Sequence, residues 1–500
     1  MLYILNIVIL TIFLSFTLSR TAHCQKPEEV TVIFASHMAE IQPVHPQGGL
    51  AQLSTLLKEN RAKKKHVLFF HGGAALAPSI LSSFDRGSHM VSLLNILEPD
   101  VMAVAKSDLA HKEDELTLRT FEAVFPFINS NLFDPLTGSN IEGTLPFLTL
   151  KAGRFTLGIM SLIDPDVITD YMPERVKIVN TTTTILETTK ALRVRGADLI
   201  ILLADYLPPT IDKWLDSKIV DIALISDPRL TPQPNQKSHN YYELDTDNSV
   251  AYILSLTLTK KKPLAEWTGN IITVPLMGIK KDPVITKKIT KETEYLAKIL
   301  SKKIGKTLTP IDTRRIFVRT KENGFGNFIA DTLRDFYSSD IALINGGAIR
   351  GNRQYSAGTM LTRGDIHREL PFSSRITKIR VTGRQIFLCL ENGLSKIETE
   401  KGRFPHFSGM RVTYNPNNAP GRRVLTVMIG ETPINLYKHY TLATLDYLAK
   451  GGDGYDILKN SKELVKIGGG KSLWEYVKNR ISSKGEISPT IDGRLKAVAN

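Results

Sequence analysis

Cysteine is almost absent from this sequence of 500 residues, which contains only Cys24 and Cys389. Cys24 lies near the end of an apolar N-terminal segment that we expect to be removed, which leaves Cys389 without a partner in the same chain. The mature protein is therefore expected to have no intrachain disulfide bond. Cys389 lies in a segment with a helical pattern, residues 384–391, and is most simply a small buried apolar side chain.

Long apolar runs are also missing after the first 18 residues. Residues 2–18 are almost wholly apolar, which is short for a membrane-spanning helix, so we predict a signal peptide over residues 1–25. Because no positive charge precedes the run, an uncleaved signal anchor is the alternative. No apolar tail precedes Asn500, so a C-terminal lipid anchor is not expected. We expect a secreted or periplasmic protein with no transmembrane domain in the mature chain.

A basic stripe interleaved with aromatic side chains, the pattern of nucleic-acid-binding surfaces, is not present either. The sequence has 64 lysines and arginines against 50 acidic residues, a net charge of +14. The excess is scattered, with only short runs such as residues 63–65 and 260–262. Dedicated nucleic-acid binding is therefore not expected, although weak attraction to anionic ligands or membrane surfaces is compatible with this charge.

Short apolar runs rich in β-branched residues alternate with helical stretches from Val30 to about Leu254. The runs that we interpret as buried strands are residues 30–34, 66–70, 101–104, 157–160, 199–203 and 222–225. This alternation predicts an α/β domain in which helices pack on the faces of a sheet. Several of these strands end in loops of unusual composition, and such loops are where the sites of α/β domains lie.

A further apolar run, residues 340–344, predicts another buried strand and ends at Asn345, Gly346 and Gly347. Glycines at a strand end allow backbone N–H groups to approach a ligand closely. Arg350 follows, and its forked cationic side chain suits a carboxylate or a phosphate. A tight turn with a surface arginine is the simpler interpretation of these residues taken alone.

The turn does not stand alone, because several segments together resemble the C-terminal domain of the 5′-nucleotidase family in order and spacing: residues 322–327, 344–350, 370–372, 403–409 and 450–455. The resemblance implies that Arg350 holds the anionic end of a nucleotide. It also implies that Phe404 and Tyr447 stack on the two faces of the base and that Asp453 hydrogen-bonds to the nucleoside. Tyr447 stands where the family more often has Phe. As members of a hydrophobic core, the aromatic residues would need no ligand.

The N-terminal half is similar to the calcineurin-like metallophosphatase domain of the same family, on residues 48–51 and 125–131. The resemblance implies an α/β protein with three parts after the signal peptide. These are an N-terminal metallophosphoesterase sandwich (26–268), a helical linker region (269–312) and a C-terminal α/β 5′-nucleotidase substrate-binding domain (313–500). In active relatives the C-terminal domain moves about the linker to carry substrate to the metals.

Within the linker region, apolar side chains recur at helical spacing at residues 285, 289, 296, 299 and 300. This spacing predicts a helix with a single apolar stripe. The lysines on its other faces are most simply a solvated surface. Arg314 and Arg315, beyond the helix, are interpreted as surface charges without an assigned role.

The metal-binding loops of the family are not matched. Its ligand positions are occupied here by Ser36, Met38, Ala74, Lys106, Ser107, Asp205, Asp227 and Arg229. A two-metal phosphatase holds cations about 3.5–4 Å apart with imidazole and carboxylate donors from several loops. Ser, Met, Ala and Lys supply almost none of these donors, and Ser107 replaces the imidazole that would protonate the leaving group. We therefore expect a metallophosphatase fold with no catalytic residues and no cofactor.

One weakly bound divalent metal ion is the alternative. The residues with suitable donors at or near the replaced positions are His37, His71, Asp108, Asp205 and Asp227. Two carboxylates and one histidine can bind a single hard cation weakly. His37 is one residue away from the family position, which at a strand end turns its side chain to the opposite face. A loop or surface position is the simpler interpretation of each.

Three functions follow from these observations. The first is binding of a nucleotide, nucleoside or similar phosphorylated small molecule through the C-terminal domain, without hydrolysis. The second is an active metal-dependent 5′-nucleotidase with an unconventional site, acting in nucleotide catabolism. The third is a scaffold or interaction module whose protein partner the sequence does not identify. Metal content separates the second from the first, and nucleotide binding separates the first from the third.

Overall fold

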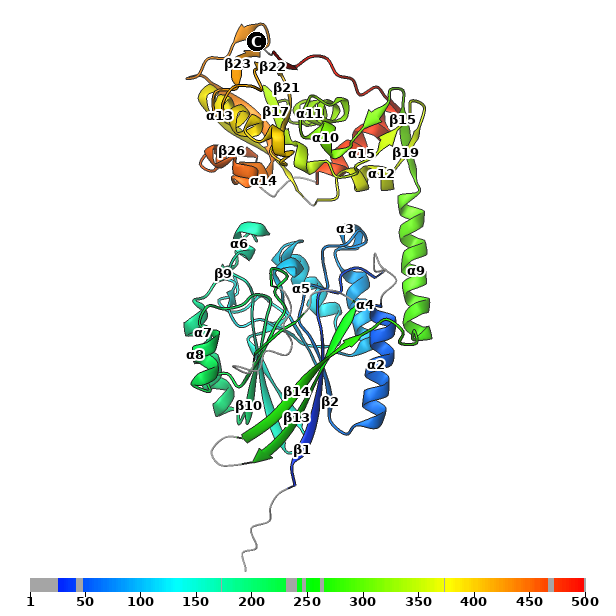
Figure 1. Cartoon of the computed structure of the whole chain (residues 1–500), viewed down its shortest axis with the longest axis vertical. Helices are drawn as coiled ribbons and strands as arrows, with labels where there is room; N and C mark the ends of the chain where they lie inside the picture. Colours follow the sequence, from blue (N-terminus) through cyan, green and yellow to red (C-terminus); the bar gives the residue numbers. More distant parts are fainter. Residues whose placement is uncertain are drawn as a thin grey trace, which may run out of the picture. The chain divides into compact units, whose positions relative to one another are not determined.

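The structure is a computed structural model, drawn in Figure 1. It describes residues 26–41, 48–171, 173–230, 241–244, 249–260, 265–372, 374–465 and 472–498. The predicted signal peptide over residues 1–25, which includes Cys24, lies outside the described residues. Within the described ranges, no helix is both long enough and apolar enough to cross a membrane. The chain divides into two compact units, Met1–Lys287 and Lys288–Asn500, which are described separately.

The first unit contains a sheet of seven strands. Two strands at one edge are antiparallel to their neighbours, and the rest run parallel. In spatial order its strands are β14 (Ala265–Pro275), β13 (Val250–Lys260), β1 (Glu28–Ala35), β2 (Val67–His71), β3 (Val101–Ala103), β4 (Phe127–Ile128) and β6 (Thr144–Leu145).

A second sheet of this unit has five strands, parallel except for the last pair. In spatial order they are β12 (Tyr241–Glu243), β11 (Ile222–Ile225), β10 (Leu199–Ala204), β8 (Phe155–Leu162) and β7 (Phe147–Ala152). A short pair consists of β5 (Leu132–Phe133) and β9 (Lys177–Ile178). The six strands predicted from the N-terminal half of the sequence all fall on β1, β2, β3, β8, β10 and β11, so that prediction is confirmed.

Helices cover the outer faces of both sheets (Figure 1). α2 (Leu50–Lys63) and α4 (Ser88–Leu97) lie beside the larger sheet, while α7 (Thr181–Val194) and α8 (Ile211–Asp216) pack on the smaller one. The remaining short helices are α3 (Ser82–Asp85), η1 (Lys106–Leu109), α5 (Glu113–Glu122) and α6 (Val167–Asp170). α7 begins where the Asn180 side chain accepts a hydrogen bond from the Thr183 N–H, which satisfies one of the free donors of its first turn.

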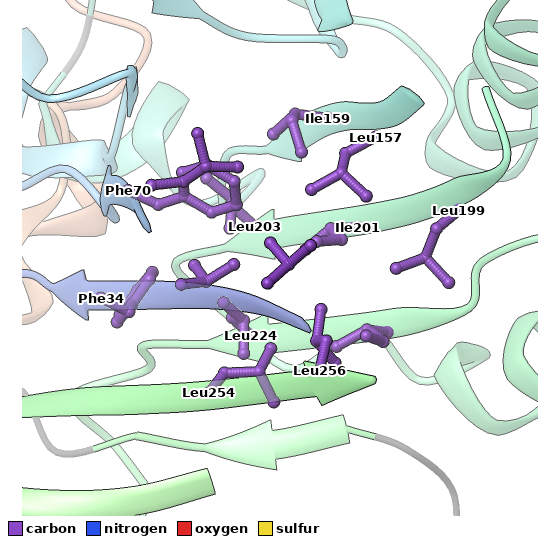
Figure 2. Close-up of a cluster of buried hydrophobic side chains, with 14 of the residues drawn as sticks. Phe34, Phe70, Leu157, Ile159, Leu199, Ile201, Leu203, Leu224, Leu254 and Leu256 are labelled. Carbon is purple, nitrogen blue, oxygen red and sulfur yellow. The ribbon is translucent and has the colours of Figure 1, made fainter. Parts of the chain in front are cut away.

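The core of the first unit lies between the two sheets (Figure 2). Phe34 and Phe70 of the larger sheet face Leu157 and Ile159 of the smaller one, and all four are buried. Burying each such side chain contributes about 1.5–3 kcal/mol. Every residue from Leu199 to Leu203 is buried, because helices cover the other face of their sheet. This explains why the strand is a continuous apolar run and not an alternating one.

The apolar stripe of the linker region does form a helix, α9 (Pro283–Leu300). Asp282 precedes it and accepts hydrogen bonds from the N–H groups of Val284 (2.8 Å) and Ile285 (3.2 Å). Lys58 of α2 pairs with the same carboxylate. Burial acts to raise the pKa of Asp282, but the hydrogen bonds from Lys58 and the helix outweigh it and lower the pKa to about 2. The start of α9 is thereby fixed to the first unit.

The second unit is built on a mixed sheet of five strands. In spatial order they are β21 (Pro405–Ser408), β17 (Ile341–Asn345), β25 (His439–Leu445), β20 (Ile376–Thr382) and β26 (Lys462–Val465). The smaller sheets contain β24 (Thr432–Pro433), β23 (Val424–Ile429), β22 (Met410–Tyr414) and β28 (Leu495–Ala497); β19 (Met360–Thr362), β15 (Lys303–Thr307) and β27 (Glu486–Ile487); and β16 (Ile311–Asp312) with β18 (Gln354–Tyr355). The predicted strand before the glycine turn is β17.

The helices of the second unit are α10 (Arg315–Val318), α11 (Gly324–Tyr337), α12 (Arg363–Glu369), α13 (Gly383–Leu394), α14 (Asp446–Ala449) and α15 (Leu473–Lys484). Single turns of 3₁₀ helix are η2 (Gly346–Ala348), η3 (Ile397–Thr399), η4 (Gly452–Gly454) and η5 (Asp456–Leu458). Cys389 lies in α13 as predicted; it is buried, and burial raises the pKa of its thiol. Asn323 begins α11 by accepting the N–H groups of Phe325 and Gly326, both at 3.0 Å.

Candidate functional site

The loops of the first unit that hold the positions identified by the resemblance as metal-binding lie at the carboxyl ends of the parallel strands. Asp205, directly after β10, connects two of them. Its carboxylate accepts the Lys106 N–H at 2.5 Å and the Asp164 N–H at 2.7 Å. Burial raises the pKa of Asp205 to about 7, although these two hydrogen bonds oppose the rise. The Asp205 carboxylate thus joins the loops that follow β3 and β8 by accepting their backbone N–H groups.

Lys106 reaches across the same junction. Its Nζ lies 3.2 Å from Oδ2 of Asp164 and 2.8 Å from Oδ2 of Asp170. Burial alone would lower the pKa of Lys106, but the two carboxylates outweigh burial and raise it. Asp164 follows β8 and was not singled out from the sequence, because no spacing relates it to the other loops.

Arg229 is the second cation at these strand ends. Its Nε lies 2.8 Å from Oδ1 of Asp227, and its Nη2 lies 2.9 Å from Oδ2 of the same carboxylate. The Nη2 group is also 3.2 Å from Asp164, which therefore lies between Arg229 and Lys106. Burial would raise the pKa of Asp227, but the hydrogen bonds from Arg229 lower it. Lys106 and Arg229 thus form one ion-pair network with the buried carboxylates of Asp164 and Asp227, to which the exposed carboxylate of Asp170 is joined through Lys106.

The carboxylate of Asp108 is hydrogen-bonded to backbone N–H groups. Its carboxylate accepts four N–H groups, from Ala74 (2.8 Å), Ala75 (2.9 Å), Leu76 (2.8 Å) and Ala105 (3.0 Å). Burial raises the pKa of Asp108, and the four donors oppose that rise. A carboxylate has about four lone-pair sites. In this structure Asp108 serves to join the loop after β2 to the loop after β3.

Burial disfavours the charged form of both histidines of the group, of which His71 is fully buried and His37 partly buried. Burial lowers the pKa of His37 to about 4, against the nearby charge of Asp227, and that of His71 to about 3, where proximity to His37 adds to the effect. His37 Nδ1 lies 3.3 Å from the Ser36 hydroxyl. His71 Nδ1 accepts the Gly73 N–H at 3.1 Å, so the ring proton lies on Nε2, which is buried with no hydrogen-bond partner in the described part of the chain.

Three further positions that the resemblance identifies as metal-binding offer few donors. Ser36 and Met38 are buried directly after β1, and the Ser107 hydroxyl is buried without a hydrogen-bond partner among the described residues. Across all the ranges that the structure describes, no three His, Cys, Asp or Glu side chains are arranged to hold a metal ion. Among the five candidate ligands of the single-ion alternative, His37 lies near Asp227 and His71, but no three of the five are grouped so that they could hold an ion in the described ranges.

In the second unit, Asn345 ends β17 and turns its side chain toward Asp453. The Asn345 Nδ2 group donates to Oδ2 of Asp453 at 2.7 Å, while its Oδ1 is buried with no hydrogen-bond partner in the described ranges. The N–H groups of Gly346 and Gly347 donate to the carbonyls of Phe404 (2.6 Å) and Gly402 (2.7 Å). A Cβ at Gly346 would lie 2.1 Å from the Val318 carbonyl oxygen. Close packing of the chain requires glycine at that position.

Arg350 is exposed beyond this turn. Its guanidinium carbon lies 5.4 Å from the centre of the Phe372 ring, a cation–π contact that leaves the N–H donors available. Arg319 lies close by: burial lowers its pKa, and the charges of Arg315 and Arg350 lower it further, while Asp453 opposes them. The Arg319 Nε is buried without a partner among the described residues.

This group of arginines was only partly found from the sequence. The sequence predicts an anion contact for Arg350 and a surface charge for Arg315, and it indicates no role for Arg319. Arg315 does contact an acid, since its Nε lies 3.4 Å from Glu400. Arg314 pairs with Asp312 at 2.6 Å and fits the surface interpretation. The sequence signal that could have found Arg319 is the density of arginines just before the turn at residues 322–327.

The two predicted stacking rings differ in exposure. Tyr447 is 42% exposed, and its hydroxyl accepts the Asp453 N–H at 3.1 Å. Phe404 is 1% exposed and packs edge-on against His406, with ring centres 5.6 Å apart. In this structure Tyr447 therefore offers an accessible aromatic face and Phe404 does not.

Residues 303–460 match the family described as 5′-nucleotidase, C-terminal domain. The chain is 24% identical to human 5′-nucleotidase over 502 residues, which covers 90% of this chain and 85% of that protein. A match of 32% identity to the trifunctional nucleotide phosphoesterase protein YfkN of Bacillus subtilis spans 46% of this chain and only 16% of that longer protein.

A solved structure shows the same fold. The 5′-nucleotidase precursor from Thermus thermophilus superimposes with a TM-score of 0.58 at 21% identity, over 94% of this chain and 99% of that one. The predicted fold class, an α/β metallophosphoesterase sandwich followed by an α/β substrate-binding domain, is confirmed. Since the match extends through both units and the C-terminal family description covers the arginine and glycine turns, the chain belongs to the 5′-nucleotidase family.

Proposed function

We propose that this protein binds a nucleotide or a similar phosphorylated small molecule through its second unit and does not hydrolyse it. The observation that carries the proposal is the arginine group beside Asp453. Burial lowers the pKa of Arg319, and the nearby charges of Arg315 and Arg350 lower it further. Positive charges held close together at a partly buried position repel one another. An anion bound among them is favoured, because its attraction to each charge offsets that repulsion.

The chemistry of these side chains suits a phosphate. Guanidinium groups bind phosphate through two parallel N–H donors, which makes such contacts both strong and directional. Arg350 is exposed, and no carboxylate in the described part of the chain pairs with its side chain. The buried Nε of Arg319 also lacks a partner among those residues. A phosphate would supply the missing acceptor for both.

The neighbouring residues suit a nucleoside. Tyr447 offers a partly exposed ring on which a base can stack, with a contribution of about 1–3 kcal/mol and little preference among bases. Asp453 keeps acceptor capacity after its contact with Asn345, since a carboxylate accepts about four hydrogen bonds. An anion site, an aromatic face and a carboxylate close to one another fit a phosphate, a base and a sugar.

The loss of hydrolysis is proposed from the first unit. A two-metal centre needs carboxylates and imidazoles that are free to coordinate. Here Asp227 and Asp164 are paired with Arg229 and Lys106, and the Asp108 carboxylate is filled by backbone donors. These residues do not fit a two-metal centre, because side-chain cations already lie beside the carboxylates. We therefore derive no catalytic step through a metal.

Two other functions are kept as alternatives. The relatives named above carry the names of nucleotidases and phosphoesterases, which favours an active hydrolase with an unconventional or single-metal site. A scaffold or interaction module needs neither ligand nor metal. Secretion or a periplasmic location is proposed as well; the Thermus relative is described as a precursor.

Calorimetric titration of the full-length protein with AMP and adenosine, with and without EDTA, tests the proposal. We expect AMP to bind equally well in both conditions and to be recovered intact after incubation. Metal-dependent release of phosphate from AMP would favour the hydrolase instead. Absence of any binding at millimolar ligand would favour the scaffold.

A further inference from the structure

Tyr447 and Asp453 come from neighbouring turns of the second unit, α14 and η4, and the structure connects them directly. The Asp453 N–H donates to the Tyr447 hydroxyl oxygen at 3.1 Å, and that hydroxyl lies 3.4 Å from Oδ1 of Asp453. One hydroxyl group thus contacts both the backbone and the side chain of Asp453. The outer end of the ring is held by the residue that the proposed function assigns to the sugar.

Gly452 supports the flat side of the same ring. A Cβ built on Gly452 would lie 2.4 Å from both Cε2 and Cζ of Tyr447, well inside van der Waals contact. The neighbouring Gly451 has a φ of +91°, whereas the φ of Gly452 lies outside the left-handed region. Backbone conformation therefore requires glycine at position 451, and the Tyr447 ring requires it at position 452. The ring lies directly on the peptide backbone.

Asp453 is itself fixed in place. Its backbone is left-handed, with φ of 53°, which Asp tolerates better than most residues. Its Oδ2 accepts Asn345 Nδ2 at 2.7 Å, and its carbonyl accepts Asn392 Nδ2 at 3.2 Å. Asn345 ends a buried strand of the five-stranded sheet and Asn392 lies in α13. The Tyr447 hydroxyl is thus anchored, through Asp453, to both of these elements.

We propose that Gly452 and Asp453 are positioning residues that hold the Tyr447 ring as a preassembled stacking face. The inference rests on the proposed function, because it concerns how the base is received. A preorganised ring loses little rotamer entropy when a base stacks on it. Recognition of the base then depends on the turn around Asp453, even for a ligand that has no sugar to contact that carboxylate.

A ligand with a base and no sugar separates this idea from direct sugar recognition. We would measure binding of free adenine and of adenosine by NMR titration to wild type and to Tyr447→Phe, which keeps the ring and removes the tether. Adenine should bind about two- to tenfold more weakly to the variant, the worth of one hydrogen bond. Tyr437→Phe, at a tyrosine that is 88% exposed, is the matched control and should leave both affinities unchanged.

Gly452→Ala gives a second measurement. The added methyl group should displace the ring and weaken adenine binding at least as much as Tyr447→Phe does. In a Tyr447→Ala background the same glycine change should have no further effect, because the ring through which it acts is gone. Equal effects of Gly452→Ala in the two backgrounds, or unchanged adenine affinity in Tyr447→Phe, would overturn the inference while leaving nucleotide binding intact.

A measurement without ligand keeps the inference testable if the proposed function itself fails. In protein labelled with ¹³C at tyrosine rings, the Tyr447 signal is the one that Tyr447→Phe removes. We expect it to be shifted away from the position of free tyrosine in wild type and to move toward that position in Gly452→Ala. A wild-type signal already at the free-tyrosine position would mean that the ring is not held. Absence of adenosine binding with a shifted signal would reject the nucleotide function alone.

Discussion

Arg229 and Asp227 form a two-point ion pair, with Nε 2.8 Å from Oδ1 and Nη2 2.9 Å from Oδ2. The sequence resemblance predicts metal-ligand positions at these two residues. A carboxylate bound at both oxygens by a guanidinium has little coordination capacity left, and the guanidinium adds positive charge at the same point. Lys106 and Asp164 form a further ion pair through a single contact of 3.2 Å. The side chains of Lys106 and Arg229 thus place positive charge beside the carboxylates of the first unit.

The first prediction concerns metal content. The purified mature chain should bind neither zinc nor manganese stoichiometrically and should release no phosphate from nucleoside monophosphates, because its carboxylates are already paired. Elemental analysis after exposure to each metal and dialysis, together with phosphatase assays, checks this. Two metal ions per chain with metal-dependent turnover would contradict it and favour the hydrolase.

The second prediction is that restoring one ligand does not restore activity. Ala74→Asp places a carboxylate at a family position, but the other loops still lack donors, and a two-metal centre acts as a unit. Ala74 has a φ of 57°, which Asp tolerates, so the variant is expected to fold. Phosphatase assays with added manganese should show no gain over wild type. Appreciable turnover would mean that most of a metal site was already present.

The third prediction tests the ion-pair network. Lys106→Met keeps the length of the side chain and removes its charge, leaving Asp164, whose side chain is 5% exposed, with Arg229 as its remaining cation partner in the described network. Removing one partner of a buried pair is costly, and the 22% exposure of Lys106 reduces the effect, so we expect a loss of about 1–3 kcal/mol of unfolding free energy. This loss is measured by urea unfolding, with hydrogen exchange in peptides of the first unit as the readout.

A matched lysine provides the control for that experiment. Lys63 lies 3.6 Å from Glu59 on α2 with its side chain 74% exposed, and such pairs contribute little. Lys63→Met should change the unfolding free energy by less than about 0.5 kcal/mol. A loss at Lys106 no larger than the loss at Lys63 would show that the network is not a source of stability.

The fold could be predicted from sequence because burial leaves a direct pattern. The continuous apolar run of residues 199–203 indicated a strand covered on both faces, and β10 is buried throughout. The stripe at residues 285–300 indicated a helix, and α9 spans it. In each case the pattern follows from local geometry, with period 3.6 for the helix and unbroken apolarity for the strand.

The site was less accessible to such reasoning, because its contacts join distant segments. Nothing in the spacing of Arg319 and Arg350 indicates that they lie together; the turn after β17 brings them there. Likewise, Phe404 and Tyr447 have the same chemistry in sequence, yet one is 1% and the other 42% exposed. Side-chain burial at a loop depends on the packing of the whole unit, which no local pattern encodes.

The fourth prediction concerns pH. Burial lowers the pKa of His406 to about 4, even though its Nε2 lies within hydrogen-bond distance (2.8 Å) of the Val318 carbonyl, a contact that acts in the opposite direction. The ordinary value is 6.5, so between about pH 6.5 and pH 4 the unfolded chain takes up a proton that the folded chain refuses. Stability is therefore lost as pH falls through that window, by about 2 kcal/mol at pH 5 relative to pH 7 for this one group.

Comparison with a non-titrating variant isolates that contribution. His406→Gln should lose less stability between pH 7 and pH 5 than wild type does, by about 2 kcal/mol. Glu369 has a raised pKa through burial and acts in the opposite direction, but it is common to both proteins and cancels in the difference. His439→Gln, at an exposed histidine, is the control. Parallel pH profiles for wild type and His406→Gln would refute the assignment.

The last prediction is that ligand binding runs through the residues of the second unit and needs no metal. Tyr447→Ala should weaken adenosine and AMP by a similar amount, about 1–3 kcal/mol, since it removes the stacking face. Arg350→Ala should instead weaken AMP more than adenosine, because it removes a charge-assisted contact to phosphate worth about 1.5–3 kcal/mol. Arg422→Ala, at an exposed arginine just before β23, is the matched control and should change neither affinity.

Phe404 requires a more conservative substitution than Tyr447 does. Because it is 1% exposed, Phe404→Ala would leave a cavity costing about 3–5 kcal/mol and would confuse binding with folding. Phe404→Leu keeps most of the volume and removes the aromatic face. If Phe404 takes part in stacking, a ligand must first expose its ring, and Phe404→Leu should weaken adenosine; if it is only a core residue, the affinity should stay the same. Calorimetry on all these variants, in EDTA, measures the affinities. If wild type binds neither AMP nor adenosine at millimolar concentration, the pocket has no nucleotide function and the scaffold hypothesis is preferred.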